Sequence, residues 1–170
     1  RLAISCLFVS PIRDLMYQWH RRINEYLGYD AGIIGDNTFN VKPISVTTYD
    51  SAAIHMTTLG NQFGLIVFDE CHHLPGDFYR ESAIMSAAPF RLGLTATPAR
   101  SDGRHADLES LIGKIVYELK VVEATGDLLA NYRVIRVPVT LSSIEQARYD
   151  QLSQQIQQYV FKRRQENSQF

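Results

Sequence analysis

The segment DECHH, from Asp69 to His73, gathers two carboxylates, a thiol and two imidazoles directly after an apolar run. A carboxylate at the end of a buried strand can hold Mg²⁺ through water, while its neighbour orients or deprotonates an attacking water. Phosphoryl transfer needs both functions. Asp69 and Glu70 are therefore candidates for a magnesium carboxylate and a general base. For an isolated pair, a turn-capping Asp beside a solvated Glu is the commoner situation.

The same segment also contains residue types that bind zinc, namely Cys71, His72 and His73. Neighbouring residues on an extended loop point to opposite sides, and the spacings of paired zinc ligands are missing. Cys6 is the only other thiol in the chain. The pattern therefore disfavours a structural zinc site, and two cysteines are too few for a disulfide scaffold.

The elements that must position these groups can be predicted from apolar runs and helical spacing. Short apolar or β-branched runs predict strands at 2–9, 31–36, 43–50, 64–70 and 90–98. Apolar residues at helical spacing predict helices at 12–27, 51–59, 78–88 and 105–113.

This alternation predicts an α/β fold with a mostly parallel sheet and helices on both of its faces. Ligands of such sheets gather at the carboxyl ends of the strands. Polar clusters follow four of the predicted strands, so we expect them along one edge of the sheet: 10–11, 47–50, 69–73 and 95–98. The chain begins within its first strand, 2–9, which we expect to be buried on both faces but to have an exposed edge that can pair with a second copy.

The C-terminal part has a different character. Residues 132–141 resemble a strand, but Pro138 within them favours an edge strand or a linker. Ser142 and Glu145 form a capping box, and an apolar stripe indicates a long helix from there to about residue 165. The basic residues 162–164 at its end offset the helix dipole. We therefore divide the chain into 1–120 and 121–170.

Composition excludes several classes of protein. The chain has 170 residues, is 45% hydrophobic and carries a formal charge of -1, as an ordinary globular protein does. There is no net basic field, so any contact with nucleic acid must come from local groups. No apolar run approaches the roughly 18 residues of a membrane span. Cys6 and Cys71 lie beside apolar runs as reduced cysteines do, which indicates a cytoplasmic location.

Two segments together carry a family resemblance. VFDECHH at 67–73, followed by LGLTATP at 92–98, resembles the DExH box and the Ser/Thr-Ala-Thr motif of superfamily 2 helicases. The wider stretch 85–105 is similar to the XPB-type branch, with type III restriction motor subunits as close neighbours. The resemblance covers about 2–120 as a first RecA-like motor domain, and 130–165 more loosely as the connection toward a second.

The resemblance implies a role for each matching residue. It assigns Asp69 to Mg²⁺ coordination and Glu70 to activating the water that attacks the γ-phosphate of ATP. It implies that His72 couples nucleotide state to the rest of the motor. Thr95 and Thr97 match the motif that links hydrolysis to movement along the nucleic acid.

Two further segments are similar to the family's nucleic-acid-contacting motifs. In VSPIRDLMYQW, Ser10 and Arg13 offer donors to phosphates, and Thr47 and Thr48 do so in VTTYDSA. For the two threonines, strand-end capping explains the residue types equally well. RSDGRH at 100–105 has Ser101 where XPB-type proteins carry an acid, which favours a solvated turn over a strand-separating element.

The resemblance also implies parts that these residues lack. Such motors need a Gly-rich loop ending in Lys-Ser/Thr to hold the phosphates, and Gly113-Lys114, in the wrong context, is the only Gly-Lys pair. We expect that loop upstream and a second RecA-like domain downstream, so that the 170 residues alone do not hydrolyse ATP. The expected parent is an ATP-dependent DNA helicase or translocase, with RNA as an open alternative.

Two other functions fit the same motifs. A restriction- or remodeller-type translocase would move on duplex without unwinding it. A degenerate motor domain would serve as a nucleic-acid or protein binding module.

Overall fold

The computed structural model describes residues 4–97, 103, 106–119, 123 and 135–167, the last of these with side chains to 163. The chain forms two compact units, Arg1–Glu118 and Leu119–Phe170. The predicted segment 100–105 lies outside the described residues except for Gly103.

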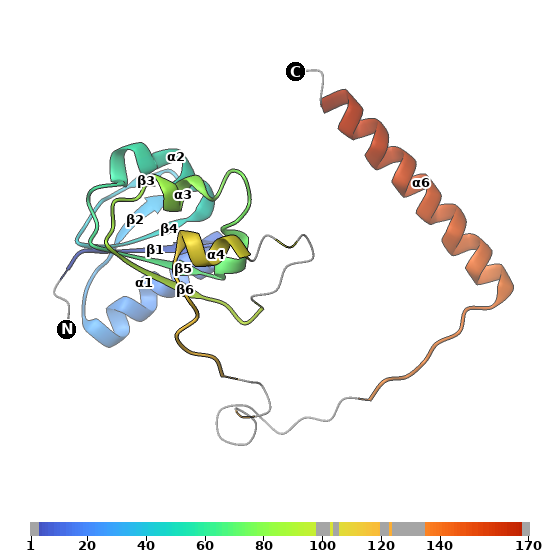
Figure 1. Ribbon diagram of the computed structural model, residues 1–170, viewed down its shortest axis with the longest axis horizontal. Coiled ribbons are helices and arrows are strands. Elements are labelled where there is room, and N and C mark those ends of the chain that lie inside the picture. Colours follow the sequence, from blue (N-terminus) through green and yellow to red (C-terminus); the bar gives the residue numbers. More distant parts are fainter. Residues whose placement is uncertain (1–3, 98–102, 104–105, 120–122, 124–134, 168–170) are drawn as a thin grey trace. The chain divides into compact units, whose positions relative to one another are not determined.

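Within the described residues, six strands form one sheet in the order β3-β2-β4-β1-β5-β6 (Figure 1). The strands are β1 (Cys6–Ser10), β2 (Gly32–Gly35), β3 (Thr38–Phe39), β4 (Ile44–Thr48), β5 (Leu65–Asp69) and β6 (Phe90–Leu94). All neighbouring pairs are parallel except β2 with β3. The predicted α/β class with a mostly parallel sheet is thus confirmed.

The position of β1 corrects one expectation. β1 is a central strand, hydrogen-bonded to β4 on one side and to β5 on the other. Leu7 and Val9 on it are fully buried. The predicted burial of this strand is thus confirmed, but the prediction that its edge is exposed and free to pair with a second copy was wrong, because both edges are already occupied.

Helices cover both faces of the sheet. These are α1 (Arg13–Leu27), α2 (Tyr49–Leu59), α3 (Glu81–Ile84) and α4 (Asp107–Leu111), with a 3₁₀ turn η1 (Cys71–His73). Met16 and Ile23 of α1 pack with Val46 in one buried cluster. Residues of α2, among them Tyr49 and Met56, belong to a second cluster on the other face.

α1 begins and ends where its sequence indicates. Its N-cap is Ile12, just after the Ser-Pro pair that closes β1. Gly28 ends it in the left-handed conformation with φ 62°, and its N–H donates to Asn24 O at 2.8 Å. Met16 and Ile23 face the sheet, so α1 is fixed along β1 and β4.

Two elements differ from their predicted bounds. α3 spans four residues of the helix predicted at 78–88, because Ala87 N–H donates to Gly60 O at 2.7 Å and leads the chain into β6. β3 was not predicted. It follows a two-residue turn in which Asp36 and Asn37 both have positive φ, the pairing that joins antiparallel strands.

The second unit contains α6, Ser143–Asn167. The predicted capping box is confirmed: Glu145 accepts from Ser142 N–H at 2.8 Å, and Ser142 Oγ accepts from Glu145 N–H at 3.4 Å. These bonds from Ser142 lower the pKa of Glu145. Residues 135–142 form no strand, so of the two alternatives for this described part, the linker holds and the edge strand was wrong.

Candidate active site

β5 brings Asp69 to the carboxyl edge of the sheet. Ile66, Val67 and Phe68 before it are buried, which fixes the strand between its neighbours. Tyr49 donates its hydroxyl to Asp69 O at 3.1 Å, and burial raises the pKa of Tyr49, so this hydroxyl stays protonated. The end of β5 is thus held by the neighbouring strands of the sheet and by the Tyr49 hydroxyl.

The Asp69 carboxylate has a donor on each oxygen. Oδ1 accepts from Glu70 N–H at 3.1 Å, and Oδ2 accepts from Trp19 Nε1–H at 2.8 Å. A carboxylate offers about four lone pairs, so two bonds leave room for a water or a metal-bound water. Asp69 is therefore oriented and still able to accept further ligands.

Glu70 turns the chain sharply. Its φ of 49° and ψ of 51° lie in the left-handed region, which is uncommon for a residue with a side chain. η1 follows at once, with His73 N–H donating to Glu70 O at 3.0 Å. The turn leaves the Glu70 side chain 38% exposed, so water can reach its carboxylate.

Thr95 joins this turn to the neighbouring strand. Asp69 is paired with Leu94 in the β5–β6 register, which places Thr95 beside the turn. His72 Nδ1 lies 2.9 Å from Thr95 Oγ1 and 3.3 Å from Glu70 Oε2. Thr95 Oγ1 donates to Glu70 Oε2 at 3.5 Å and accepts from Thr97 N–H at 3.1 Å. The structure thus brings the five predicted catalytic residues together.

Gly93 permits this close approach. A side-chain carbon on it would lie 2.9 Å from Cys71 Sγ and 2.7 Å from Ile112 Cδ1. Both neighbours are parts of the packed core, so neither can give way at little cost. The glycine therefore lets η1 rest against β6, which is what places His72 within reach of Thr95.

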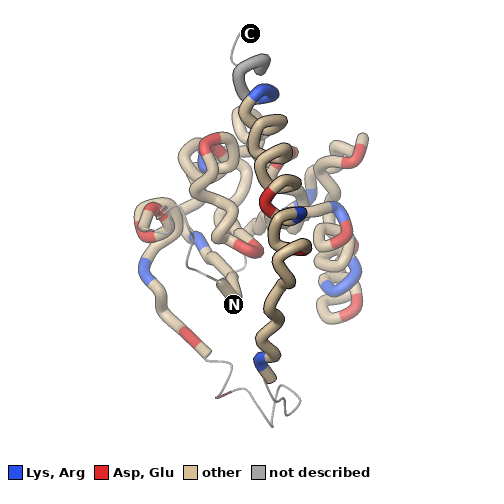
Figure 2. Tube along the Cα trace, turned by 90° about the vertical axis from the view of Figure 1, so that its right-hand side faces the viewer, with Lys and Arg blue, Asp and Glu red and all other residues tan. Residues whose placement is uncertain are grey.

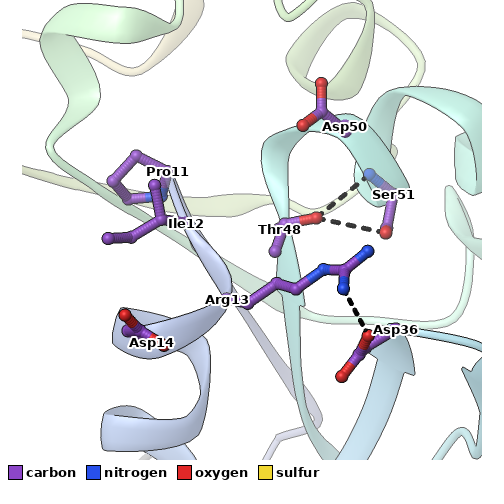
Figure 3. A pocket seen from close by; sticks show the side chains of 8 residues that line it. All are labelled: Pro11, Ile12, Arg13, Asp14, Asp36, Thr48, Asp50 and Ser51. Atoms are coloured by element: carbon purple, nitrogen blue, oxygen red, sulfur yellow. Dashed lines mark hydrogen bonds and ion pairs between the residues drawn. The ribbon is translucent and has the colours of Figure 1, made fainter.

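A hollow lies at the carboxyl ends of β1 and β4, beside the β2–β3 turn (Figure 3). Arg13 reaches across it to Asp36, with Nη1 2.6 Å from Oδ1, and Tyr17 donates its hydroxyl to Asp36 Oδ2 at 2.8 Å. The Arg13 side chain is 67% exposed. It is therefore the accessible cation among the residues predicted to contact nucleic acid.

The other three residues predicted there have internal positions. Ser10 is fully buried, and its hydroxyl has no hydrogen-bond partner among the described residues. Thr47 is also fully buried and donates to Ile34 O at 2.7 Å. Thr48 caps α2 by accepting from Ser51 N–H at 3.3 Å. Both threonines thus have the structural function that was the alternative explanation.

Comparison with known proteins agrees with this geometry. The family described as "Type III restriction enzyme, res subunit" matches residues 2–100. The chain belongs to this family. The matched residues include every predicted site residue, and the resemblance to XPB-like superfamily 2 proteins is confirmed by the relatives described next.

Several curated relatives carry the name XPB, and two of them match most of this chain. The "DNA 3'-5' translocase XPB2" of Sulfurisphaera tokodaii is 44% identical over 162 residues, which are 95% of this chain and 37% of the relative. The "DNA 3'-5' helicase XPB" of Mycobacterium tuberculosis is 32% identical, over 78% of this chain and 26% of the relative. The chain thus spans about a third of the length of these relatives.

A solved structure supports the fold. The UvsW helicase from bacteriophage T4 superposes with a TM-score of 0.57 at 19% identity, covering 66% of this chain and 44% of that one. At this identity the likeness concerns the fold alone. It agrees with the RecA-like α/β arrangement predicted for this member of the res-subunit family.

The residues fit a magnesium ion held together with phosphates. Mg²⁺ in nucleotide sites is bound through one or two carboxylates, waters and the substrate's own oxygens. Asp69 supplies one oriented carboxylate of that kind. No group of three metal-ligating side chains occurs within the part of the chain that the structure describes, so a metal cage made of protein ligands alone is not found there.

Cys71 does not present a metal ligand. It is 5% exposed, and burial raises the pKa of its thiol to about 11, which disfavours the thiolate that zinc requires. Its sulfur lies against Gly93 in the core.

The raised pKa of Cys71 predicts a loss of stability in alkali. The unfolded thiol ionises near 9.0 and the folded one near 11, so its contribution is complete below about pH 9 and is lost as the pH rises toward 11. Between pH 8 and pH 10, ionisation of Cys71 should lower the free energy of unfolding by on the order of 1 kcal/mol. We expect this part of the fall to be missing in Cys71→Ala. Urea denaturation at each pH measures this. An unchanged fall in the variant would contradict the assignment.

Sequence analysis missed two residues of this site. Trp19 was recognised only as one of the apolar positions of α1, and Asp36 only as part of a strand end. A signal for Trp19 existed, because a half-buried indole N–H needs an acceptor. The sequence alone did not indicate which acceptor it meets.

No helix among the described residues is long and apolar enough to cross a membrane.

Proposed function

We propose that the full-length protein is an ATP-dependent DNA helicase or translocase and that residues 1–118 are its first motor domain. The observation that carries this proposal is the contact of Glu70, His72 and Thr95 beside the oriented carboxylate of Asp69. The names of the XPB relatives support DNA as the track. A second RecA-like domain and the phosphate-binding loop belong to the same proposal.

Each residue has a step in the proposed reaction. Bound Mg²⁺ would neutralise charge on the β- and γ-phosphates of ATP. Asp69 would hold the metal ion, since the Trp19 and Glu70 N–H groups orient its carboxylate. Glu70 orients the attacking water and accepts its proton, since its carboxylate is open to solvent.

The threonine network supports the coupling role. Thr95 contacts Glu70, His72 and Thr97 at once, so a change at the Glu70 carboxylate is transmitted to the loop after β6. We propose that this loop and Arg13 report the state of ATP to the nucleic acid. A cytoplasmic location is proposed as well, in keeping with two buried free cysteines.

Charge alone does not identify the track. In Figure 2 basic and acidic residues are interspersed along the described trace, and the formal charge is -1. Contact with phosphates would therefore depend on a few local groups such as Arg13.

Strand displacement and duplex tracking test the proposal. The full-length protein is incubated with ATP and either a forked duplex or a triplex whose third strand is released by movement on intact duplex. We expect ATP-dependent release of a strand in at least one assay. Release in the triplex assay alone favours a duplex translocase. No release in either, with DNA still bound, favours the binding module and contradicts the motor proposal.

Asp36→Asn is expected to strengthen DNA binding. Asp36 holds the Arg13 guanidinium at 2.6 Å and adds a negative charge to the hollow. Its removal frees Arg13 for phosphates. We expect the affinity for DNA at 50 mM salt to rise two- to five-fold, which corresponds roughly to the free energy of one exposed ion pair. Asparagine tolerates the left-handed turn at this position. Fluorescence anisotropy between 50 and 200 mM salt measures the affinity.

Asp30→Asn is the matched control. Asp30 pairs with Lys42 at the same distance, 2.6 Å, but precedes β2 at the opposite end of that strand. We expect no change in DNA affinity from this variant. Equal effects of the two variants would show that net charge, and not Arg13, is responsible.

A further inference from the structure

We propose that Trp19 is a positioning residue for the Asp69 carboxylate and that α1 thereby connects Arg13 to the hydrolysis site. The inference rests on the proposed function, since it takes Asp69 as the magnesium carboxylate and Arg13 as a phosphate contact. It concerns residues that lie 50 positions apart in the chain and meet across the sheet.

The indole is held so that its N–H has one direction. Its ring lies against Phe8 of β1, with centroids 4.8 Å apart and planes inclined by 31°. It also packs against the cluster that contains Met16 and Ile23, both of them buried. Since the ring cannot turn without breaking these contacts, Nε1–H stays aimed at Asp69 Oδ2 at 2.8 Å.

This hydrogen bond sets which lone pairs Asp69 offers. With Glu70 N–H on Oδ1 and the indole on Oδ2, the plane of the carboxylate is fixed from both sides. Removing a donor that orients a metal ligand in this way typically costs about 10- to 100-fold in metal affinity or activity. Glu70 N–H alone would fix one oxygen and leave the carboxylate free to rotate about it.

α1 makes the same hydrogen bond sensitive to events at its first turn. Arg13 and Trp19 are separated by about two turns of one continuous helix. Arg13 is exposed and forms an ion pair with Asp36 of the β2–β3 turn. A phosphate that draws Arg13 away from Asp36 pulls on the first turn of α1, and a small tilt of the helix changes the distance from Nε1 to Oδ2.

The simpler explanation is that a half-buried indole has found an acceptor and that Asp69 is merely the nearest one. That explanation predicts no effect on metal binding when the N–H is removed and the ring is kept. Trp19→Phe does this, because phenylalanine retains the contact with Phe8 and lacks a donor.

Metal affinity separates the two explanations. Mn²⁺ binding to the full-length protein is followed by electron paramagnetic resonance in the presence of a non-hydrolysable ATP analogue. We expect Trp19→Phe to weaken Mn²⁺ about ten-fold. Arg21→Gln, on the exposed side of the same helix, is the control and should bind as the unaltered protein does. An affinity of Trp19→Phe within two-fold of the unaltered protein overturns the proposal.

Folding is checked by thermal denaturation of each variant. If phenylalanine destabilises the fold, Trp19→Leu provides a second apolar side chain without a donor, and the same result is expected from it. Absence of Mn²⁺ binding in the unaltered protein would refute the proposed function. Normal Mn²⁺ binding that is insensitive to both Trp19 variants would refute only the role of Trp19.

The proposed coupling between Arg13 and the Asp69 site can be measured separately. Coupling between two sites is reciprocal, so DNA should change the Mn²⁺ affinity and Mn²⁺ with the analogue should change the DNA affinity by the same factor. We expect this factor to approach one in Trp19→Phe and in Arg13→Ala. A factor unchanged in Trp19→Phe would show that α1 does not carry the coupling.

Discussion

Glu70→Gln is expected to lower the rate of ATP hydrolysis by the full-length protein by about 10²- to 10⁴-fold, the usual contribution of a general base. Glutamine keeps the size of the side chain and can still meet Thr95 Oγ1. It cannot accept the proton of the attacking water. Binding of ATP should be retained, so the loss should appear in kcat and not in KM.

Glu81→Gln provides the comparison for this variant. Glu81 is an exposed carboxylate at the start of α3, away from the turn after β5. We expect the Glu81→Gln variant to hydrolyse ATP at the same rate as the unaltered protein. A Glu70→Gln rate within ten-fold of the unaltered protein would mean that another group activates the water.

Thr95→Val is expected to separate hydrolysis from movement. Valine has nearly the shape of threonine, but it removes the hydroxyl that contacts Glu70, His72 and Thr97. We expect movement on DNA to fall at least ten-fold, which is the loss of about 1.4 kcal/mol of coupling, while ATP hydrolysis falls much less. The ratio of ATP consumed to strand released measures the effect.

Thr57→Val tests whether any such substitution has this effect. Thr57 is exposed on α2 and belongs to no part of the network. Its ratio of hydrolysis to strand release should match the unaltered protein. If Thr95→Val reduces hydrolysis and movement equally, Thr95 serves the chemical step itself and does not act as a coupling residue.

The catalytic cluster could be predicted because it follows from strand geometry. Asp69 and Thr95 each come at the end of an apolar strand, and the ends of adjacent parallel strands meet at one edge. The sequence therefore predicted that segments 69–73 and 95–98 lie along one edge of the sheet, while the direct contact of Glu70 and His72 with Thr95 follows from the β5–β6 pairing that only the structure shows. The resemblance to superfamily 2 helicases then supplied the roles that geometry alone leaves open.

The remaining features depend on packing that periodicity does not encode. The central position of β1 is set by its pairing with both β4 and β5, and an apolar run does not reveal its neighbours. The Trp19–Asp69 hydrogen bond needs the crossing of α1 over the sheet. β3 has two residues, too few to show alternation, although the Asp36–Asn37 turn before it was a usable signal.

The burial of Ser10 and Thr47 shows a related limit. Residue type and position at a strand end suggested phosphate contacts, but both side chains point into the packed layer and Thr47 donates to Ile34 O. Exposure depends on which face of the strand a residue occupies, and a strand buried on both faces gives no alternation to read. Their contact with nucleic acid stays a prediction, and the proposal rests on Arg13.

ATP hydrolysis by the full-length protein, measured without nucleic acid and with single-stranded DNA, double-stranded DNA or RNA, tests the central claim most directly. The account predicts a rate that rises with one form of DNA and disappears in Glu70→Gln. A rise with RNA alone would support the motor function but identify RNA, and not DNA, as the nucleic acid along which it moves. No hydrolysis under any of these conditions would contradict the assignment of Asp69, Glu70, His72 and Thr95 to an ATPase site.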